Sequence, residues 1–215
     1  MALSIIKYHD STNWLTWLDA LSEDNYVIID QFLDLTIYAE VKAYFLSKFQ
    51  FFSQAGIGTQ LQATICTDIR GDRIYWLEKE AVTTIPSFWG LIDETISMFN
   101  RYCFLSLASS EFHFSNYPPG THYDAHVDQF QNSNNRIISI IMYLNDDWQT
   151  GDGGELEIFR GDNKTVSVEP IARRCVMFKS ANILHRVLQC NKSRYSVTGW
   201  LLHRPSTLGQ FFLRS

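Results

Sequence analysis

The stretch HYDAHVD, residues 122–128, twice places a histidine two positions before an aspartate. In an extended strand, residues i and i+2 point to the same face, so each pair could direct an imidazole nitrogen and a carboxylate oxygen at one metal ion. The pairs are His122 with Asp124 and His126 with Asp128. The pattern alone decides little, because six His and 23 acidic residues in 215 produce such pairs by chance.

A second histidine in a later β-rich segment makes the pattern more specific. Together with His126 and Asp128, His185 completes the set of two histidines and one carboxylate that holds Fe(II) and leaves adjoining positions open. Nine residues further on lies Arg194, whose planar guanidinium suits a dicarboxylate better than a lysine ammonium would. The spacing therefore predicts an iron centre with an anion site beside it.

The elements that must position these residues change in character along the chain. Apolar residues at three- and four-residue spacing predict helices over 13–24, capped by Ser11 or Thr12, over 33–49 and over 87–102. From residue 111, short runs rich in Ile, Val, Tyr and Phe alternate with turn sequences and predict eight strands. These are 111–117, 122–128, 136–145, 155–160, 164–170, 173–179, 185–190 and 194–203.

Eight short strands at such spacing predict a mainly β protein with flanking helices. We expect a double-stranded β-helix (jelly-roll) core whose N-terminal helices pack on one sheet. The chain is interpreted as a single domain, 1–215. Its predicted parts are a mainly helical support with a substrate loop (1–105), the jelly-roll core (106–203) and a C-terminal tail (204–215).

Composition narrows the classes of partner. A formal net charge of -5 argues against a nucleic-acid-binding surface, which would need a basic stripe. There is no signal-peptide pattern and no apolar run of roughly 20 residues, so no membrane partner is expected. Four scattered cysteines without C-x-x-C spacing predict reduced, mostly buried thiols. We expect a cytoplasmic monomer.

The four residues of the predicted centre, taken with the surrounding sequence, resemble the iron- and 2-oxoglutarate-dependent dioxygenases. The similarity narrows to prolyl 4-hydroxylases of the hypoxia-inducible-factor type, bacterial members included. It runs over roughly residues 66 to 203 and rests on DIRGDRIYW (68–76), YLNDDW (143–148), GGELEIF (153–159) and RYSVTGWLL (194–202). The resemblance implies Fe(II), the cosubstrate 2-oxoglutarate, O₂ and, as a further cofactor, ascorbate.

That resemblance also implies a reaction and its targets. A prolyl residue of a protein or peptide would be hydroxylated while 2-oxoglutarate is converted to succinate and CO₂. The substrate would be elongation factor Tu for a stand-alone bacterial member and the hypoxia-inducible factor for an animal one.

Individual roles follow by matching positions. In the family the iron-binding pair follows a tyrosine by three residues and reads His-Val-Asp, which selects His126 and Asp128 over the first pair in the stretch. Arg194 would bind the C5 carboxylate of 2-oxoglutarate, with the Tyr143 hydroxyl as a second donor. Tyr117 would reach the metal-binding end of the cosubstrate, although its spacing to His126 is one residue shorter than in the family. The remaining pocket residues would be Leu156, Val187 and Thr198.

Substrate selection is predicted for residues 62–80, which resemble a mobile loop that closes over the peptide. Asp72 and Arg136 match a family pair that forms a salt bridge near the target proline, and Trp76 and Trp200 would offer apolar surface to its ring. The end of the tail, 209–215, is a candidate cover for the entrance. Two histidines, His113 and His203, are typical of surface or hydrogen-bonded core positions and receive no role.

Two other functions fit parts of the pattern. A hydroxylase of a free amino acid or small metabolite would keep the iron chemistry but would not need most of residues 62–80. A non-catalytic, cupin-like metal-binding sensor would have no use for Arg194, and it would bind iron without 2-oxoglutarate.

Overall fold

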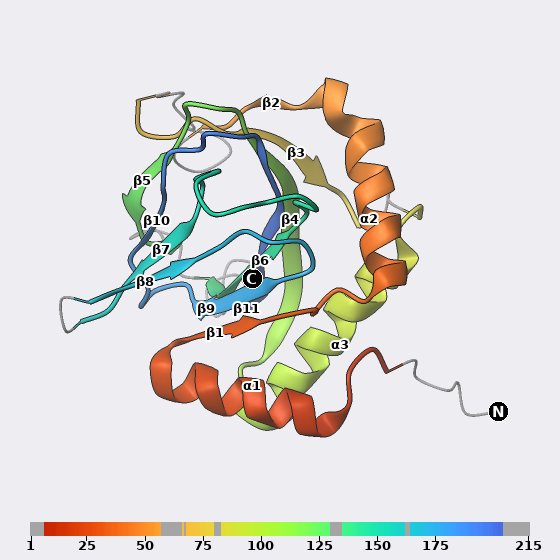
Figure 1. Ribbon diagram of the computed structural model, residues 1–215. Coiled ribbons are helices and arrows are strands. Elements are labelled where there is room, and N and C mark those ends of the chain that lie inside the picture. Colours follow the sequence, from red (N-terminus) through yellow and green to blue (C-terminus); the bar gives the residue numbers. More distant parts are fainter. Residues whose placement is uncertain are drawn as a thin grey trace, which may run out of the picture.

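The computed structural model describes residues 7–56, 66, 68–79, 83–129, 135–161 and 164–203. Two antiparallel sheets face each other, one with the strand order β1-β9-β6-β11-β4-β3-β2 and one with the order β5-β10-β7-β8 (Figure 1). Buried residues from both sheets fill the space between them. This arrangement confirms the predicted double-stranded β-helix.

The strands of the major sheet are β1 (Tyr26–Ile29), β2 (Ser53–Gln54), β3 (Arg73–Leu77), β4 (Leu107–Tyr117), β6 (Arg136–Tyr143), β9 (Cys175–Lys179) and β11 (Arg194–His203). Those of the minor sheet are β5 (Tyr123–His126), β7 (Leu156–Phe159), β8 (Thr165–Val168) and β10 (His185–Val187). The helices are α1 (Ser11–Asp24), α2 (Leu35–Lys48) and α3 (Pro86–Cys103), with a short 3₁₀ turn η1 (Phe49–Phe51) after α2.

All three predicted helices are present, and their starts are set by carboxylates and a proline. Asp10 caps α1 by accepting from the Asn13 amide at 2.9 Å, so neither of the two predicted caps is the right one. Asp34 caps α2 in the same way, from the Ile37 amide at 2.8 Å, and that helix begins two residues later than predicted. Pro86 occupies the first turn of α3.

The helices cover one face of the major sheet, on the side away from the minor sheet (Figure 1). Alternate residues of β4 and β11, such as Phe112 and Val197, point into this helix-side core. Gly199 is required there, because a Cβ atom at this position would lie 2.2 Å from the Phe112 ring. The other face of the same strands points to the interior between the sheets, where Arg194 and Ser196 are buried.

The sequence did not predict that the N-terminal half adds strands to the sheet. β1 pairs with β9 and β3 pairs with β4, so residues 1–105 contribute strands to the major sheet as well as the predicted helices. Arg73–Leu77 lies within the loop predicted for 62–80, but it forms a strand, because this run of β-branched and aromatic residues pairs with β4. Most of residues 57–67, residues 80–82 and the tail 204–215 lie outside the described residues.

Within the described ranges, no helix is long and apolar enough to cross a bilayer. The four cysteines are free thiols; Cys175 and Cys190 are buried and Cys66 and Cys103 half-buried.

Candidate metal centre and anion pocket

Two histidines of the minor sheet lie side by side because their strands pair. His126 on β5 is the direct cross-strand partner of His185 on β10, and their ring centroids are 4.3 Å apart. Asp128 completes the group: its Oδ1 lies 3.5 Å from Nε2 of His126 and 3.9 Å from Nε2 of His185. One ligand atom from each residue lies within 4.8 Å of the others, so the three can surround one ion.

The strand predicted for residues 122–128 is shorter than expected. β5 ends at His126, and Asp128 lies just beyond it. There the chain leaves the minor sheet, and the carboxylate reaches the major sheet by accepting a hydrogen bond from the Ser139 hydroxyl of β6 at 2.6 Å. The centre therefore lies at the junction of the two sheets.

Hydrogen bonds select the histidine tautomers that a metal requires. Nδ1 of His126 lies 2.7 Å from the carbonyl oxygen of Asp124, and Nδ1 of His185 lies 3.1 Å from that of Ile183. A carbonyl oxygen only accepts, so each Nδ1 must carry the proton, and each Nε2 keeps its lone pair toward the centre. A second hydrogen bond of this kind is typical of metal-ligating histidines.

The charges within the centre also suit a cation. Burial favours the protonated form of Asp128, but His185, His126 and the Ser139 hydroxyl more than offset this, and the pKa of Asp128 is well below its usual range. Burial lowers the pKa of His185 to about 4, against the opposing effect of Asp128. At neutral pH the group therefore presents a carboxylate and a neutral buried imidazole, which are the forms that bind metal.

The first pair of the stretch HYDAHVD lies outside this centre. Nε2 of His122 lies 3.3 Å from Oδ1 of Asp124, and the two side chains are 36% and 59% exposed. Tyr123, which lies between these two residues in the sequence, stacks its ring on that of His126 at a centroid distance of 3.7 Å. Simple alternation would place residues 122, 124 and 126 on one face. The register shift between β5 and β10, which sets Tyr123 opposite Val187 and His126 opposite His185, separates the exposed pair from the ligands.

Arg194, at the start of β11, is a buried cation that lies against Tyr117 and Tyr143, two residues of the core between the sheets. It is only 2% exposed. Its Nε donates to the Gly154 carbonyl at 2.8 Å and its Nη1 to Ser196 Oγ at 3.4 Å. Among the described residues it has no carboxylate partner. Gly154 is needed here because a Cβ would meet the Arg194 side chain at 2.9 Å, which explains part of the GGELEIF segment.

Two tyrosines lie beside this guanidinium, and the hydroxyl of one of them, Tyr143, has no hydrogen-bond partner among the described residues. The rings of Tyr117 and Tyr143 lie 5.1 and 5.0 Å from the Arg194 guanidinium carbon. Tyr143 is fully buried, and its hydroxyl has no hydrogen-bond partner among the described residues. Burial raises the pKa of Tyr143, so the hydroxyl keeps its proton at neutral pH. A buried guanidinium without a carboxylate partner, beside a hydroxyl that has no hydrogen-bond partner among the described residues, suits a carboxylate ligand.

The structure places the other residues predicted for this pocket beside these groups. Leu156 and Val187 belong to the same buried cluster as Tyr117 and Tyr143. Thr198 is half-buried, with Oγ1 3.3 Å from Ser196 Oγ on the face of β11 that carries Arg194. Ser139 and Gly154 were not predicted from the sequence as site residues. Period-two alternation along β6 would have placed Ser139 inward.

The predicted ion pair between Asp72 and Arg136 is not the arrangement found. Asp72 is fully buried and accepts two hydrogen bonds from Arg70, at 2.6 and 3.1 Å, and one from Ser115 at 3.3 Å. Arg136 instead pairs with Glu111 at 2.6 Å. A partner two residues away on the same turn is easily reached by Asp72, whereas Arg136 lies across the sheet on β6.

Two of the predicted substrate residues form one wall of stacked rings with His113. Trp76 on β3 and Trp200 on β11 have ring centroids 6.4 Å apart, and His113 on β4 contacts both. The Arg136 guanidinium covers the Trp200 ring at 3.5 Å. His113 is 1% exposed and makes no hydrogen bond with the described residues, contrary to the expectation of a surface or hydrogen-bonded position.

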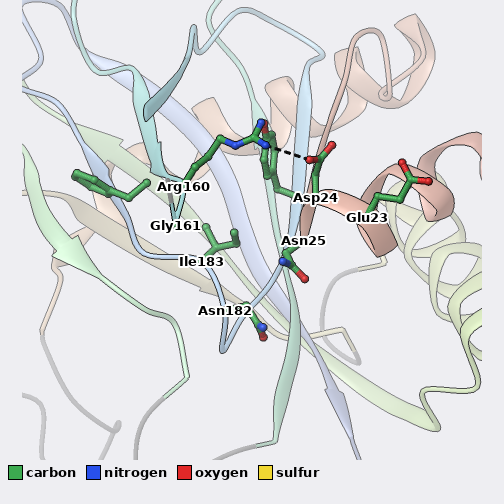
Figure 2. A pocket seen from close by; sticks show the side chains of 9 residues that line it. Glu23, Asp24, Asn25, Arg160, Gly161, Asn182 and Ile183 are labelled. Atoms are coloured by element: carbon green, nitrogen blue, oxygen red, sulfur yellow. Dashed lines mark ion pairs between the residues drawn. The ribbon is translucent and has the colours of Figure 1, made fainter. Parts of the chain in front are cut away.

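A separate hollow of about 340 Å³ lies between the end of α1 and the β7–β8 hairpin (Figure 2). Figure 2 shows Arg160 turned toward Asp24, with which it pairs at 3.6 Å. The lining residues are Glu23, Asp24, Asn25, Tyr26, Phe159, Arg160, Gly161, Asn182 and Ile183. None of them belongs to the predicted site.

Known proteins resemble this chain in sequence and in overall fold. Residues 112–202 match the model of the 2OG-Fe(II) oxygenase superfamily. A Pseudomonas putida prolyl-4-hydroxylase has a crystal structure that is 30% identical, with a TM-score of 0.80, covering 89% of this chain and 99% of that one. The chain belongs to the 2OG-Fe(II) oxygenase superfamily.

Two further proteins are similar to this chain, one in sequence and one in fold. Prolyl hydroxylase EGLN3 of Mus musculus is 34% identical over 144 residues, 61% of this chain and 58% of the relative. A prolyl hydroxylase of Trichoplax adhaerens, solved with a hypoxia inducible factor peptide fragment, shares the fold with a TM-score of 0.79 at 24% identity, covering 91% of this chain and 94% of that one. The chain spans only 33% to 58% of the length of the curated mammalian relatives it matches.

Members of this superfamily use Fe(II), 2-oxoglutarate and O₂, and the donor set here fits these groups. His126, Asp128 and His185 offer the three ligands of a facial iron site. The unpaired Tyr143 hydroxyl and the buried guanidinium of Arg194 suit the distal carboxylate of 2-oxoglutarate.

Proposed function

We propose that this oxygenase hydroxylates a prolyl residue of a protein or peptide and consumes 2-oxoglutarate and O₂. The observation that carries the proposal is the combination of a three-ligand centre with an unpaired buried cation beside it. The homology to prolyl hydroxylases and the shape shared with the Pseudomonas putida prolyl-4-hydroxylase support the target residue.

In this proposal each group of residues has a distinct task. His126, Asp128 and His185 would hold the iron, which supplies the oxidising chemistry when it is bound with 2-oxoglutarate. Arg194 and Tyr143 would orient the distal carboxylate of the cosubstrate, because the guanidinium lies 5.0 Å from the Tyr143 ring and the Tyr143 hydroxyl has no partner among the described residues. The packed residues Leu156 and Val187 would keep water from it. Tyr117 and Thr198 would complete its lining.

The aromatic wall supports a prolyl substrate. Trp76 is half-buried and lies beside Trp200, one face of which is covered by Arg136; a pyrrolidine ring would pack on the accessible part of Trp76 and against the edge of Trp200. Arg136 and Asp72, through their pairs with Glu111 and Arg70, would fix the edges of this entrance. We propose elongation factor Tu as the protein substrate if the enzyme is bacterial, and a peptide of the hypoxia-inducible factor if it is not.

We further propose that the enzyme acts as a monomer in the cytoplasm. All ligands of the centre come from one chain, and free thiols such as Cys66 suit a reducing compartment. Ascorbate would sustain turnover by keeping the iron reduced.

The test combines a binding and a turnover measurement. Anaerobic Fe(II) and 2-oxoglutarate should give a weak charge-transfer band in the wild type, lost in His126→Ala and kept in His122→Ala. In air, the protein should release succinate in step with the addition of one oxygen atom to a proline of elongation factor Tu, located by fragment mass spectrometry. Parallel reactions use the hypoxia-inducible-factor peptide and free L-proline.

Each other outcome would point to a different function. Oxygen added only to free proline would indicate a small-molecule hydroxylase. Iron binding without any 2-oxoglutarate band would indicate a metal-binding module, and the enzymatic proposal would be wrong.

A further inference from the structure

His113 is a buried histidine that the iron and cosubstrate sites do not use. It lies in the middle of β4, on the face that also carries Ser115 and Tyr117, and is 1% exposed. Its ring lies between two indoles, with centroid distances of 4.9 Å to Trp76 and 5.5 Å to Trp200. A small apolar side chain would pack there without burying any polar atom.

Two polar atoms of this wall have no partner. Nδ1 of His113 and Nε1 of Trp200 are buried and make no hydrogen bond with the described residues. Burying such atoms without a partner is costly, and native proteins rarely do so. Two of them on adjacent rings indicate a polar ligand at this wall.

The wall is continuous with the reaction centre. His113 is the cross-strand partner of Thr198, which lies in the predicted cosubstrate pocket. Trp200 is the cross-strand partner of Ser139, whose hydroxyl donates to the iron ligand Asp128. A substrate that presents a carbon to the iron would therefore lie against these two rings.

We propose that His113 is a specificity-determining residue, and that its imidazole and the Trp200 indole N–H hydrogen-bond a main-chain amide of the polypeptide next to the target proline. This inference rests on the proposed function. An amide has one donor and one acceptor, as a neutral imidazole does, and its carbonyl can accept from the indole. A free carboxylate only accepts, so it would satisfy the pair less completely.

The environment keeps this imidazole neutral. Burial lowers the pKa of His113 well below its ordinary value, and the nearby positive charges of Arg70 and Arg136 lower it further. One ring nitrogen is then a donor and the other an acceptor at neutral pH.

The experiment uses the intact enzyme and a peptide spanning the proline that the wild type hydroxylates in elongation factor Tu. His113→Leu should raise the KM for this peptide by roughly 5- to 100-fold and change the KM for 2-oxoglutarate by less than about twofold. His113→Gln, which restores a donor and an acceptor, should recover part of the loss. Trp200→Phe, which removes the N–H and keeps a ring, should also raise the peptide KM.

Trp89→Phe is the matched control. Trp89 also has a buried indole N–H without a partner, but it lies on α3 in the helix-side core. This variant should lose similar stability and keep the wild-type peptide KM. In a second arm, an ester in place of the amide after the target proline should weaken the wild type and leave His113→Leu almost unaffected.

The outcomes separate this inference from the proposed function. If the wild type hydroxylates no polypeptide, both are wrong. If the wild type is active and the peptide KM is unchanged in His113→Leu and Trp200→Phe, only the role of His113 is wrong. Should His113→Leu fail to fold, Trp200→Phe and the ester substrate decide the question.

Discussion

Ser139→Ala is the most informative change near the proposed iron ligands, because it removes one hydrogen bond and none of the three proposed ligands. The Ser139 hydroxyl donates to Oδ2 of Asp128 at 2.6 Å and also lies 2.9 Å from the Ser180 hydroxyl. All three residues are buried, so water does not readily replace the lost donor. The other carboxylate oxygen, Oδ1, faces the two histidines.

The expected size of the effect follows from the charge of the acceptor. A hydrogen bond to an ionised group contributes about 1.5–3 kcal/mol, and a tenfold change in affinity corresponds to about 1.4 kcal/mol. If this hydrogen bond orients Asp128 for the metal, its loss should weaken Fe(II) binding by roughly 10- to 100-fold, the range known for outer-shell partners of metal ligands. The metal-free protein should lose about 1–3 kcal/mol of unfolding free energy.

Anaerobic calorimetric titration with Fe(II) measures this directly, with urea unfolding of the metal-free protein beside it. Ser180→Ala is the control, since it leaves the hydrogen bond between Ser139 and Asp128 in place and should change iron affinity less than threefold. Equal iron affinity in Ser139→Ala and wild type, with the fold intact, would refute the argument that the major sheet orients the carboxylate ligand.

Two substitutions and one labelling experiment test other parts of the molecule. Arg194→Lys should raise the KM for 2-oxoglutarate by roughly 10- to 100-fold in steady-state assays and leave the Fe(II) affinity nearly unchanged, because an ammonium cannot make the planar contacts of a guanidinium. Gly199→Ala should destabilise the fold by about 1–3 kcal/mol in thermal unfolding, because a Cβ would lie 2.2 Å from Phe112 and 2.4 Å from the Glu111 carbonyl. Cys190 should resist iodoacetamide at pH 8 and react only as the pH approaches 11, since burial raises the pKa of its thiol to about 11.

For each of these three predictions, one result would contradict the reasoning. A lysine enzyme with wild-type KM would mean that Arg194 does not bind the cosubstrate. A fully stable Gly199→Ala protein would mean that β11 can move away from Phe112. Rapid labelling of Cys190 at pH 8, measured by peptide mass spectrometry, would mean that the loop before β11 opens in solution.

The sequence predicted the centre well where spacing alone decides which residues meet. His126 and His185 come together because β5 and β10 pair, and the strand pattern of residues 107–203 was strong enough to anticipate both. The inward position of Arg194 could be predicted for a similar reason. It is the first residue of a long strand whose inward and outward faces are clear from the sequence. Short strands far from this pattern were less visible, and β1 and β3 were missed.

Contacts that depend on how two sheets face each other could not be predicted. Ser139 sits in the apolar run RIISIIMY, and nothing in the run says that Asp128 reaches it from the other sheet. The predicted ion pair between Asp72 and Arg136 was wrong because a nearer cation was overlooked. Asp72 pairs with Arg70, which is only two residues away in the sequence. His113 looked ordinary until its neighbours on β3 and β11 were known.

Each sheet contributes different groups to the site, and this explains why the fold supports it. The minor sheet supplies the two imidazoles, and the major sheet supplies the hydrogen bond to Asp128, the buried cation and the aromatic wall. Phe178 on β9 lies where these contributions meet: it pairs with Ser139 in the major sheet and its ring lies 4.6 Å from that of His185. The packing that holds the sheets together is therefore also the packing that sets the distance between the imidazoles and the carboxylate.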